Sequence, residues 1–232
     1  MTSQQNDTTY RQQLRPFICL IGIDGSGKTA HARILFIELI KSGISCVHVS
    51  SRSSLLQLMP CSLRSWLEKN AHIGPRNMTL PSLKERGFKS SRCNILFRIP
   101  LSLFFIIYTL LTYLITIRPL LRKYVVVSDR YFYDLFYNLW GDASFALVRM
   151  LPKPTIGFLL DLPVPTALSR MHSLEDKKIP QKYYELLRKY YLAIAKQNNL
   201  HIIDNSVDFE KSSKCILVHV KAFLESSGKN AP

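Results

Sequence analysis

The chain has 232 residues, of which 47% are hydrophobic and 20% charged, and this balance excludes a disordered or low-complexity protein. Its 31 lysines and arginines outweigh 16 acidic residues, and the formal net charge of +15 favours anionic partners. Nucleotides, nucleic acid, phosphorylated metabolites and an acidic membrane surface all fit that charge. The five cysteines form no C-x-x-C pair, which argues against a zinc ribbon or disulfide framework and favours a reducing compartment.

The length predicts one compact domain, expected over residues 17–226. Residues 1–16 and 227–232 are expected to be flexible tails because they are polar and lack hydrophobic periodicity. The first residues also lack the basic and then apolar order of a secretory signal, so a cytoplasmic location is expected.

Short apolar runs alternate with longer helical patterns along this domain. The first run, 17–21, stops at Gly22, and residues 28–42 then carry Ala30, Ile34, Ile37 and Ile40 at helical spacing. Further strands are expected at 44–49, 124–128, 156–160 and 200–203. Strands that alternate with helices predict an α/β protein with a five-stranded parallel sheet and helices on both of its faces.

Residues 51–92 form a basic insertion with no recognisable motif. Glu68 and Glu85 are outnumbered by Arg52, Arg64, Lys69, Arg76, Lys84, Arg86, Lys89 and Arg92. A solvent-facing insertion and a contact surface for an acidic membrane or a polyphosphorylated acceptor both fit this composition.

Residues 99–117 form an uncharged, very apolar segment between Arg98 and Arg118. It approaches the length of about 20 residues that crosses a bilayer. A single crossing would, however, place the strands before and after it on opposite sides of the membrane, where they could not share a sheet. A buried or membrane-surface helix is therefore expected, with a true span and a partner-binding helix as the alternatives.

The first strand leads directly into a match to the pattern G-x-x-x-x-G-K-[ST]. The matching residues are Gly22, Ile23, Asp24, Gly25, Ser26, Gly27, Lys28 and Thr29. Glycines let backbone N–H groups curl around a phosphate, and the start of the following helix adds partial positive charge. Lys28 is expected to reach the β- and γ-phosphates of ATP, and the Thr29 hydroxyl to ligate Mg²⁺.

Two later strands end in a carboxylate. Asp129 follows the strand 124–128 and is expected to serve Mg²⁺ or the proton of an acceptor, while the adjacent Arg130 is placed to clamp an anionic acceptor. The alternative makes Asp129 a helix cap and Arg130 a surface charge. Asp161 competes for the metal role, but Pro163 and Pro165 after it favour a structural turn.

With these motifs in place, the chain resembles the thymidylate kinase family of P-loop nucleoside monophosphate kinases. The resemblance continues through the segment 158–170, the helix around Tyr190 and the strand 201–204. It implies that Asp24 lies near the transferring phosphoryl group, that Asp129 and Arg130 serve Mg²⁺ or the acceptor phosphate, and that a basic lid closes over ATP. The lid would be 171–181, with Arg170, Lys177 and Lys178 as its basic residues.

The acceptor region departs from the family pattern. The chain reads Ser50-Ser51-Arg52-Ser53 where the family usually has Arg-Glu-Pro-Gly, the arginine after Leu96-Phe97 is displaced to Arg98, and Asp134 replaces a serine. The expected function is transfer of the ATP γ-phosphate to a nucleoside monophosphate similar to dTMP. The alternatives are a membrane-associated or glycan-related phosphorylated acceptor and a nucleotide-binding switch without catalysis.

The expected partners are ATP and a phosphorylated small molecule, with peripheral membrane contact and a homodimer left open. No nucleic acid is expected, because no recognition element such as a helix-turn-helix is present in the sequence. Four tyrosines in the segment 183–191 fall on helical spacing and predict core packing rather than a base-stacking surface.

Overall fold

A computed structural model describes residues 14–49, 91–171, 179–206 and 208–229. Residues 51–90 of the expected basic insertion, and Lys177 and Lys178 of the expected lid, lie outside the described residues. Their predicted roles therefore stay predictions.

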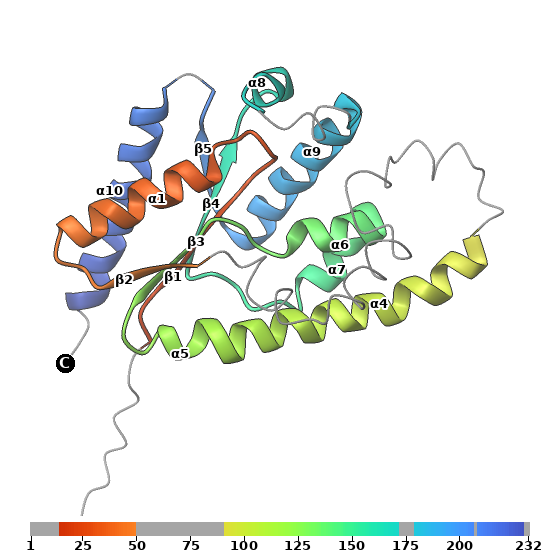
Figure 1. Cartoon of the computed structure of the whole chain (residues 1–232), viewed down its shortest axis with the longest axis horizontal. Coiled ribbons are helices and arrows are strands. Elements are labelled where there is room, and N and C mark those ends of the chain that lie inside the picture. Colours follow the sequence, from red (N-terminus) through yellow and green to blue (C-terminus); the bar gives the residue numbers. More distant parts are fainter. Residues whose placement is uncertain (1–13, 50–90, 172–178, 207, 230–232) are drawn as a thin grey trace, which may run out of the picture.

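The centre of the fold is a five-stranded, all-parallel sheet with the order β2-β3-β1-β4-β5 (Figure 1). The strands are β1 Phe17–Ile21, β2 Cys46–Val49, β3 Val125–Ser128, β4 Ile156–Asp161 and β5 His201–Asp204. The helices are α1 Lys28–Lys41, α4 Ser91–Leu111, η2 Thr112–Ile117, α5 Arg118–Leu120, α6 Tyr133–Trp140, η3 Gly141–Ser144, α7 Phe145–Val148, α8 Val164–Ser169, α9 Gln181–Asn198 and α10 Phe209–Lys229. The predicted α/β class and parallel sheet are confirmed.

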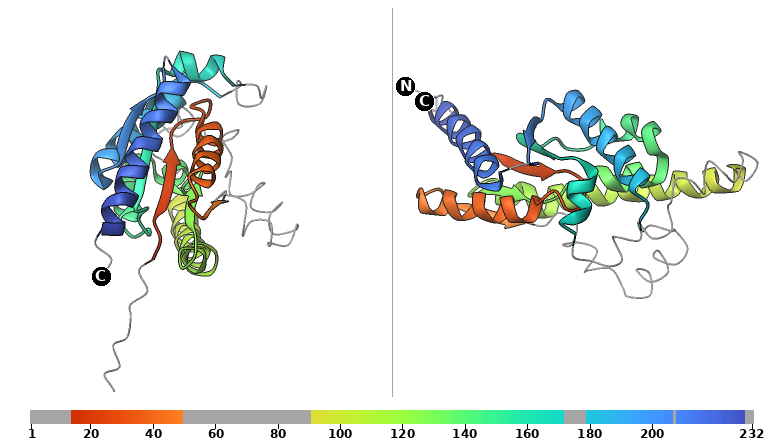
Figure 2. Two further views of the ribbon diagram at one scale, coloured as in Figure 1. Left: turned by 90° about the vertical axis from the view of Figure 1, so that its left-hand side faces the viewer. Right: turned by 90° about the horizontal axis from the view of Figure 1, so that it is seen from above.

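Helices cover both faces of the sheet because successive side chains of each strand point in opposite directions. On β1, Ile18 and Leu20 belong to a core cluster with α1 and α10, whereas Cys19 and Ile21 join a second cluster with α4, α6 and α9. Figures 1 and 2 show the sheet between these two layers. Every residue of β1 is buried, as expected of a central strand in a parallel sheet.

The helix α1 forms where the periodicity predicted it, but a different face is buried. Ile37 and Ile40 are 48% and 51% exposed, whereas Leu35 and Leu39 pack against the sheet. The predicted helix is confirmed, although the four apolar residues whose spacing predicted it are not among its buried residues. The start of the helix is fixed by the loop before it, and this register turns His31 and Ala32 inward instead.

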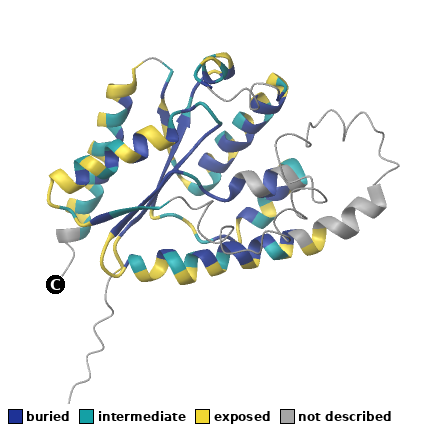
Figure 3. Cartoon of the chain, viewed as in Figure 1, coloured by how far each residue is buried: buried dark blue, intermediate teal, exposed yellow. Residues whose placement is uncertain are grey.

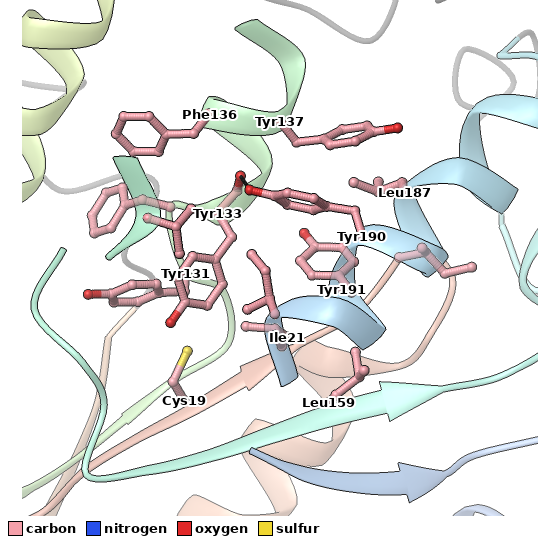
Figure 4. Close-up of a cluster of buried hydrophobic side chains, with 14 of the residues drawn as sticks. Cys19, Ile21, Tyr131, Tyr133, Phe136, Tyr137, Leu159, Leu187, Tyr190 and Tyr191 are labelled. Atoms are coloured by element: carbon pink, nitrogen blue, oxygen red, sulfur yellow. Dashed lines mark hydrogen bonds between the residues drawn. The ribbon is translucent and has the colours of Figure 1, made fainter. Parts of the chain in front are cut away.

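Aromatic side chains fill the core beneath α6 and α9. Tyr183, Tyr184, Tyr190 and Tyr191 are each at most 6% exposed, so the prediction of core packing is confirmed. Figure 4 shows Tyr190 beside Tyr133 and Tyr137 in this cluster. The Ser144 hydroxyl donates a 2.7 Å hydrogen bond to the phenol oxygen of Tyr190, which satisfies a polar group inside the apolar layer.

The apolar segment 99–117 lies in a continuous helical rod formed by α4, η2 and α5. Within it, Ser102–Leu120 is long and apolar enough to cross a membrane, although only 28% of that stretch is buried. The strands on either side of the rod, β2 and β3, are hydrogen-bonded neighbours with Cys46 opposite Val125. A single crossing by this rod would separate two strands that pair, so the rod runs along the body of the protein.

Candidate functional site

The loop between β1 and α1 is a compact cradle of backbone amides. Gly25 and Gly27 have φ angles of 79° and 81°, in the left-handed region that suits glycine. A Cβ atom on Gly25 would overlap the carbonyl group of Ala167. The loop closes on a backbone hydrogen bond from Ser26 to Ile23, and α1 begins as His31 bonds the Gly27 carbonyl. Loop amides and the first turn of a helix together suit an anion.

Lys28 is folded back over this cradle. Its Nζ atom donates to the carbonyl oxygens of Gly22 at 2.9 Å and Ile23 at 2.7 Å, and only 6% of the residue is exposed. A buried ammonium held by carbonyl dipoles is a ready partner for a phosphate that enters the loop. The lysine is thus held at the place where the motif predicts it to act.

Asp24 links two cations at the mouth of the loop. Its Oδ1 lies 3.1 Å from a terminal guanidinium nitrogen of Arg130 and 3.6 Å from Lys28 Nζ. Arg130 immediately follows Asp129 at the end of β3, and β3 pairs directly with β1. Since Asp24 and Arg130 are each about one third exposed at the side chain, this group can meet a second anionic molecule from solvent.

Thr29 and Asp129 meet although 100 positions separate them in the chain. The Thr29 hydroxyl donates to Asp129 Oδ2 at 3.1 Å. The other oxygen, Oδ1, is buried and has no hydrogen-bond partner among the described residues. A buried carboxylate oxygen left in this way needs a partner, and a hydroxyl and carboxylate together suit a hard divalent cation. These two residues therefore fit Mg²⁺, and the glycine cradle and Lys28 fit the phosphates of ATP.

Asp161, the competing candidate for the metal, is occupied elsewhere. It ends β4, on the opposite side of β1 from Asp129. Arg188 of α9 donates to both of its oxygens, at 2.6 Å from Nε and 2.8 Å from a terminal nitrogen. This bidentate pair raises the pKa of Arg188 and ties α9 to the sheet. The geometry therefore gives Asp161 a structural role.

Arg170 reaches the turn after β5 rather than pointing into solvent. Its guanidinium donates to the carbonyl oxygens of Asn205 at 2.9 Å and Ser206 at 3.2 Å. The residue ends α8 and thus stands at the start of the expected lid. Its predicted contact with ATP stays a prediction.

Asn205 is a site residue that the sequence reasoning missed. It is 1% exposed, its Nδ2 donates to the Ser26 carbonyl at 2.9 Å, and its Oδ1 lies 3.1 Å from His31 Nε2. Burial lowers the pKa of His31, and the positive charge of Arg170 acts in the same direction against an opposing effect of Asn205. The available signal was its place directly after Asp204 at the carboxyl end of a strand, where ligands bind in parallel sheets.

The carboxyl ends of β1, β3 and β5 thus bring most of the predicted residues together. Lys28, Asp24 and Arg130 form one charged group, and Thr29 with Asp129 lies beside it. No group of three or more histidine, cysteine or acidic side chains suited to hold a metal occurs in the part of the chain that the structure describes. The candidate cation site therefore consists of one hydroxyl and one carboxylate, to which a phosphate would add oxygens.

Comparison with known proteins adds sequence relatives to this geometry. No protein-family model matches the chain. Probable thymidylate kinases are 33% identical over 110 residues in Metallosphaera sedula and 35% identical over 109 residues in Thermococcus kodakarensis. These matches cover 44% and 43% of this chain but only 56% and 53% of the relatives, so the chain spans about half the length of each.

A third match extends over most of the chain. The probable thymidylate kinase of Methanothermobacter thermautotrophicus is 27% identical over 191 residues, which cover 81% of this chain and 85% of the relative. These relatives and the parallel sheet agree with the thymidylate kinase resemblance that the motifs of this chain indicate. The chain is thus similar to proteins that are named probable thymidylate kinases.

Proposed function

We propose that this protein is a kinase that transfers the γ-phosphate of ATP to a nucleoside monophosphate similar to dTMP. The observation that carries the proposal is the meeting of Thr29 with Asp129, whose second oxygen is buried without a described partner, beside Lys28 and Asp24. ATP would supply the activated phosphoryl group, and Mg²⁺ would neutralise part of its charge.

The residues have separate roles in this proposal. The loop amides and Lys28 bind and orient the donor phosphates, while Thr29 and Asp129 hold the cation. Arg130 binds the acceptor phosphate, and Asp24 keeps the guanidinium directed toward the loop through their 3.1 Å contact. Catalysis by positioning and charge neutralisation needs no covalent intermediate with the protein. Arg170 and Lys177 are the proposed basic residues of a lid.

The nucleotide acceptor is supported by the relatives, which are named probable thymidylate kinases. The residues at which the chain departs from the family pattern give no structural support for a particular acceptor. Residues 50–53 lie outside the described residues, and the side chains of Arg98 and Asp134 are not described. The choice of base and sugar therefore depends on a direct measurement.

An acceptor screen tests the proposal. ATP and Mg²⁺ are held constant, and ADP release is measured with dTMP, dUMP, CMP, AMP, GMP and a set of phosphorylated sugars. We expect the largest rise in ADP release with dTMP, accompanied by formation of the corresponding diphosphate. A preference for a phosphorylated sugar would retain the kinase and replace the acceptor.

Absence of acceptor-dependent ADP release across the whole set would contradict the kinase proposal. Binding of ATP measured in parallel then separates the two remaining cases. Tight ATP binding without turnover would point to a nucleotide-binding switch, whereas loss of ATP binding would remove the donor site as well.

A further inference from the structure

The helical rod of α4 and η2 carries a ridge of exposed apolar side chains. Its members are Ile99, Leu103, Ile107, Leu111, Leu114 and Ile115, which are between 44% and 63% exposed. Most follow one another at intervals of four residues, so each lies next to the one before it and the ridge winds gradually along the exposed surface of the rod. From first to last the ridge extends about 24 Å at 1.5 Å per residue. Figure 3 shows exposed positions recurring along the outer side of this rod.

The opposite side of the rod is packed against the protein. Phe105 is 3% exposed and contacts the ring of Phe136, and Tyr108 meets Phe132 edge-on. The rod is therefore anchored along its length by core contacts. The ridge residues are not needed to fill the core, because other side chains of the rod do so. A continuous exposed apolar surface of this kind marks an interaction site.

Basic side chains surround the end of the ridge. Arg118, Arg122 and Lys123 are exposed just beyond Ile115. Arg15 is also exposed. It lies beside these residues because its backbone N–H donates to the Leu121 carbonyl at 2.7 Å. The sequence contains no acidic residue from 91 to 128. The surface is thus apolar along the helix and purely cationic at its end.

We propose that this ridge docks on an anionic lipid surface, with the rod lying in the plane of the interface. Apolar side chains would enter the boundary between headgroups and acyl chains, while the basic end would meet lipid phosphates. The pairing of β2 with β3 keeps both ends of the rod on one side of the membrane. This mode of contact needs only the exposed side of the helix.

Charge selects lipid over a second copy of the chain. Two ridges packed in parallel would place Arg118 and Arg122 against the same residues of the partner copy. An antiparallel pair would bring that basic end toward a region of α4 that also lacks acidic residues. Anionic headgroups, in contrast, neutralise each lysine or arginine near the surface.

Vesicle flotation tests the proposal independently of ATP and of any acceptor, so its failure would leave the kinase proposal intact. The full chain is mixed with phosphatidylcholine vesicles or with vesicles that also contain phosphatidylserine. We expect flotation with the phosphatidylserine vesicles at low salt and at least about tenfold weaker flotation with phosphatidylcholine alone.

Two variants, each with a matched control, locate the contact. L103S/I107S removes two ridge residues and should reduce flotation about tenfold, whereas I40S/V218S, which alters equally exposed residues of α1 and α10, should leave it unchanged. R122Q/K123Q should weaken binding, and K211Q/K214Q, with the same charge change on α10, should not. Thermal unfolding of all four variants verifies that each one is folded.

Three results would overturn the proposal. One is failure of the wild-type chain to float with phosphatidylserine vesicles, and another is an equal loss in the control variants, which would indicate non-specific charge attraction. The third is a concentration-dependent dimer, seen by analytical ultracentrifugation, that L103S/I107S converts to a monomer while flotation is absent. That result would assign the ridge to a second copy of the chain.

Discussion

The amide of Asn205 donates a 2.9 Å hydrogen bond to the carbonyl of Ser26, across 179 positions of sequence. The last strand of the sheet thereby supports the loop that follows the first. His31 lies 3.1 Å from the other end of the same amide, and Arg170 donates to the Asn205 carbonyl. One residue therefore joins the glycine-rich loop and the first helix through its side chain, and the start of the expected lid through its backbone carbonyl.

Substitution N205A is expected to raise the KM for ATP about tenfold and change kcat less, because it removes the support of the loop and leaves two buried groups unpaired. Steady-state kinetics with varied ATP measures the split. N198A is the control, because among the described residues Asn198 donates to the Ile194 carbonyl within its own helix α9. Equal effects of the two variants on KM would show that Asn205 acts on stability alone.

Substitution K28M is expected to reduce phosphoryl transfer a hundredfold or more, by about the cost of removing a preorganised charge at the reacting phosphate. Circular dichroism and thermal unfolding should show a folded protein. K41M, which changes an exposed lysine that pairs with Glu38 on the same helix, should retain full activity. Wild-type turnover in K28M would refute the assigned role of the loop.

The pair formed by Thr29 and Asp129 predicts a change in metal dependence. T29A and D129N each remove part of the oxygen set, so half-maximal activity should require about tenfold more Mg²⁺. Activity is measured at constant ATP over a Mg²⁺ titration. D142N, which neutralises an exposed carboxylate in η3, should leave the titration unchanged. An unaltered titration in both site variants would rule out this pair as the cation site.

His31 predicts a pH dependence of stability. Its folded-state pKa is below the ordinary value of about 6.5, so the unfolded chain binds more protons between the two values. Stability from this group is full above about pH 6.5 and is lost as the pH falls through the window, by at most about 1.4 kcal/mol per pH unit. Thermal unfolding of H31Q, compared with wild type over this range, should show a smaller loss. Parallel curves for the two proteins would contradict this origin.

Two glycines with similar φ angles separate strain from steric overlap. Gly25 and Gly43 have φ of 79° and 76°, but a Cβ on Gly43 meets no atom within 4 Å, whereas one on Gly25 would overlap the Ala167 carbonyl. G43A should therefore cost about 1 kcal/mol, and G25A several times more, with loss of ATP binding. Denaturant unfolding and nucleotide titration measure both. Equal free energies of unfolding would show that the loop relaxes away from α8.

The sequence predicted the sheet well because parallel strands are buried on both sides and stand out as apolar runs. It also predicted the loop, since the glycines and Lys28 act through local geometry. The buried face of α1 does not follow from its apolar residues, because Ile37 and Ile40 are apolar yet about half exposed, and His31 is polar yet buried. A hydrophobicity pattern cannot predict that the ring nitrogens of the buried His31 have hydrogen-bond partners in Asn205 and Ser213.

The role of Asn205 was equally hidden from local patterns. Nothing next to it in the chain indicates that its partner is Ser26, because that contact depends on β5 and β1 being separated only by β4 in the sheet. Asp161 was ambiguous for the same reason. Its partner, Arg188, comes from a helix whose placement the sequence did not specify.

The position of Asn205 also has a consequence for biosynthesis. A ribosome releases the glycine-rich loop 179 positions before Asn205, the residue whose side chain supports Ser26. The nascent protein therefore carries the complete motif long before it carries a supported loop. The proposed nucleotide binding should therefore begin only after β5 has joined the sheet, because the loop gains its support from Asn205 at that step.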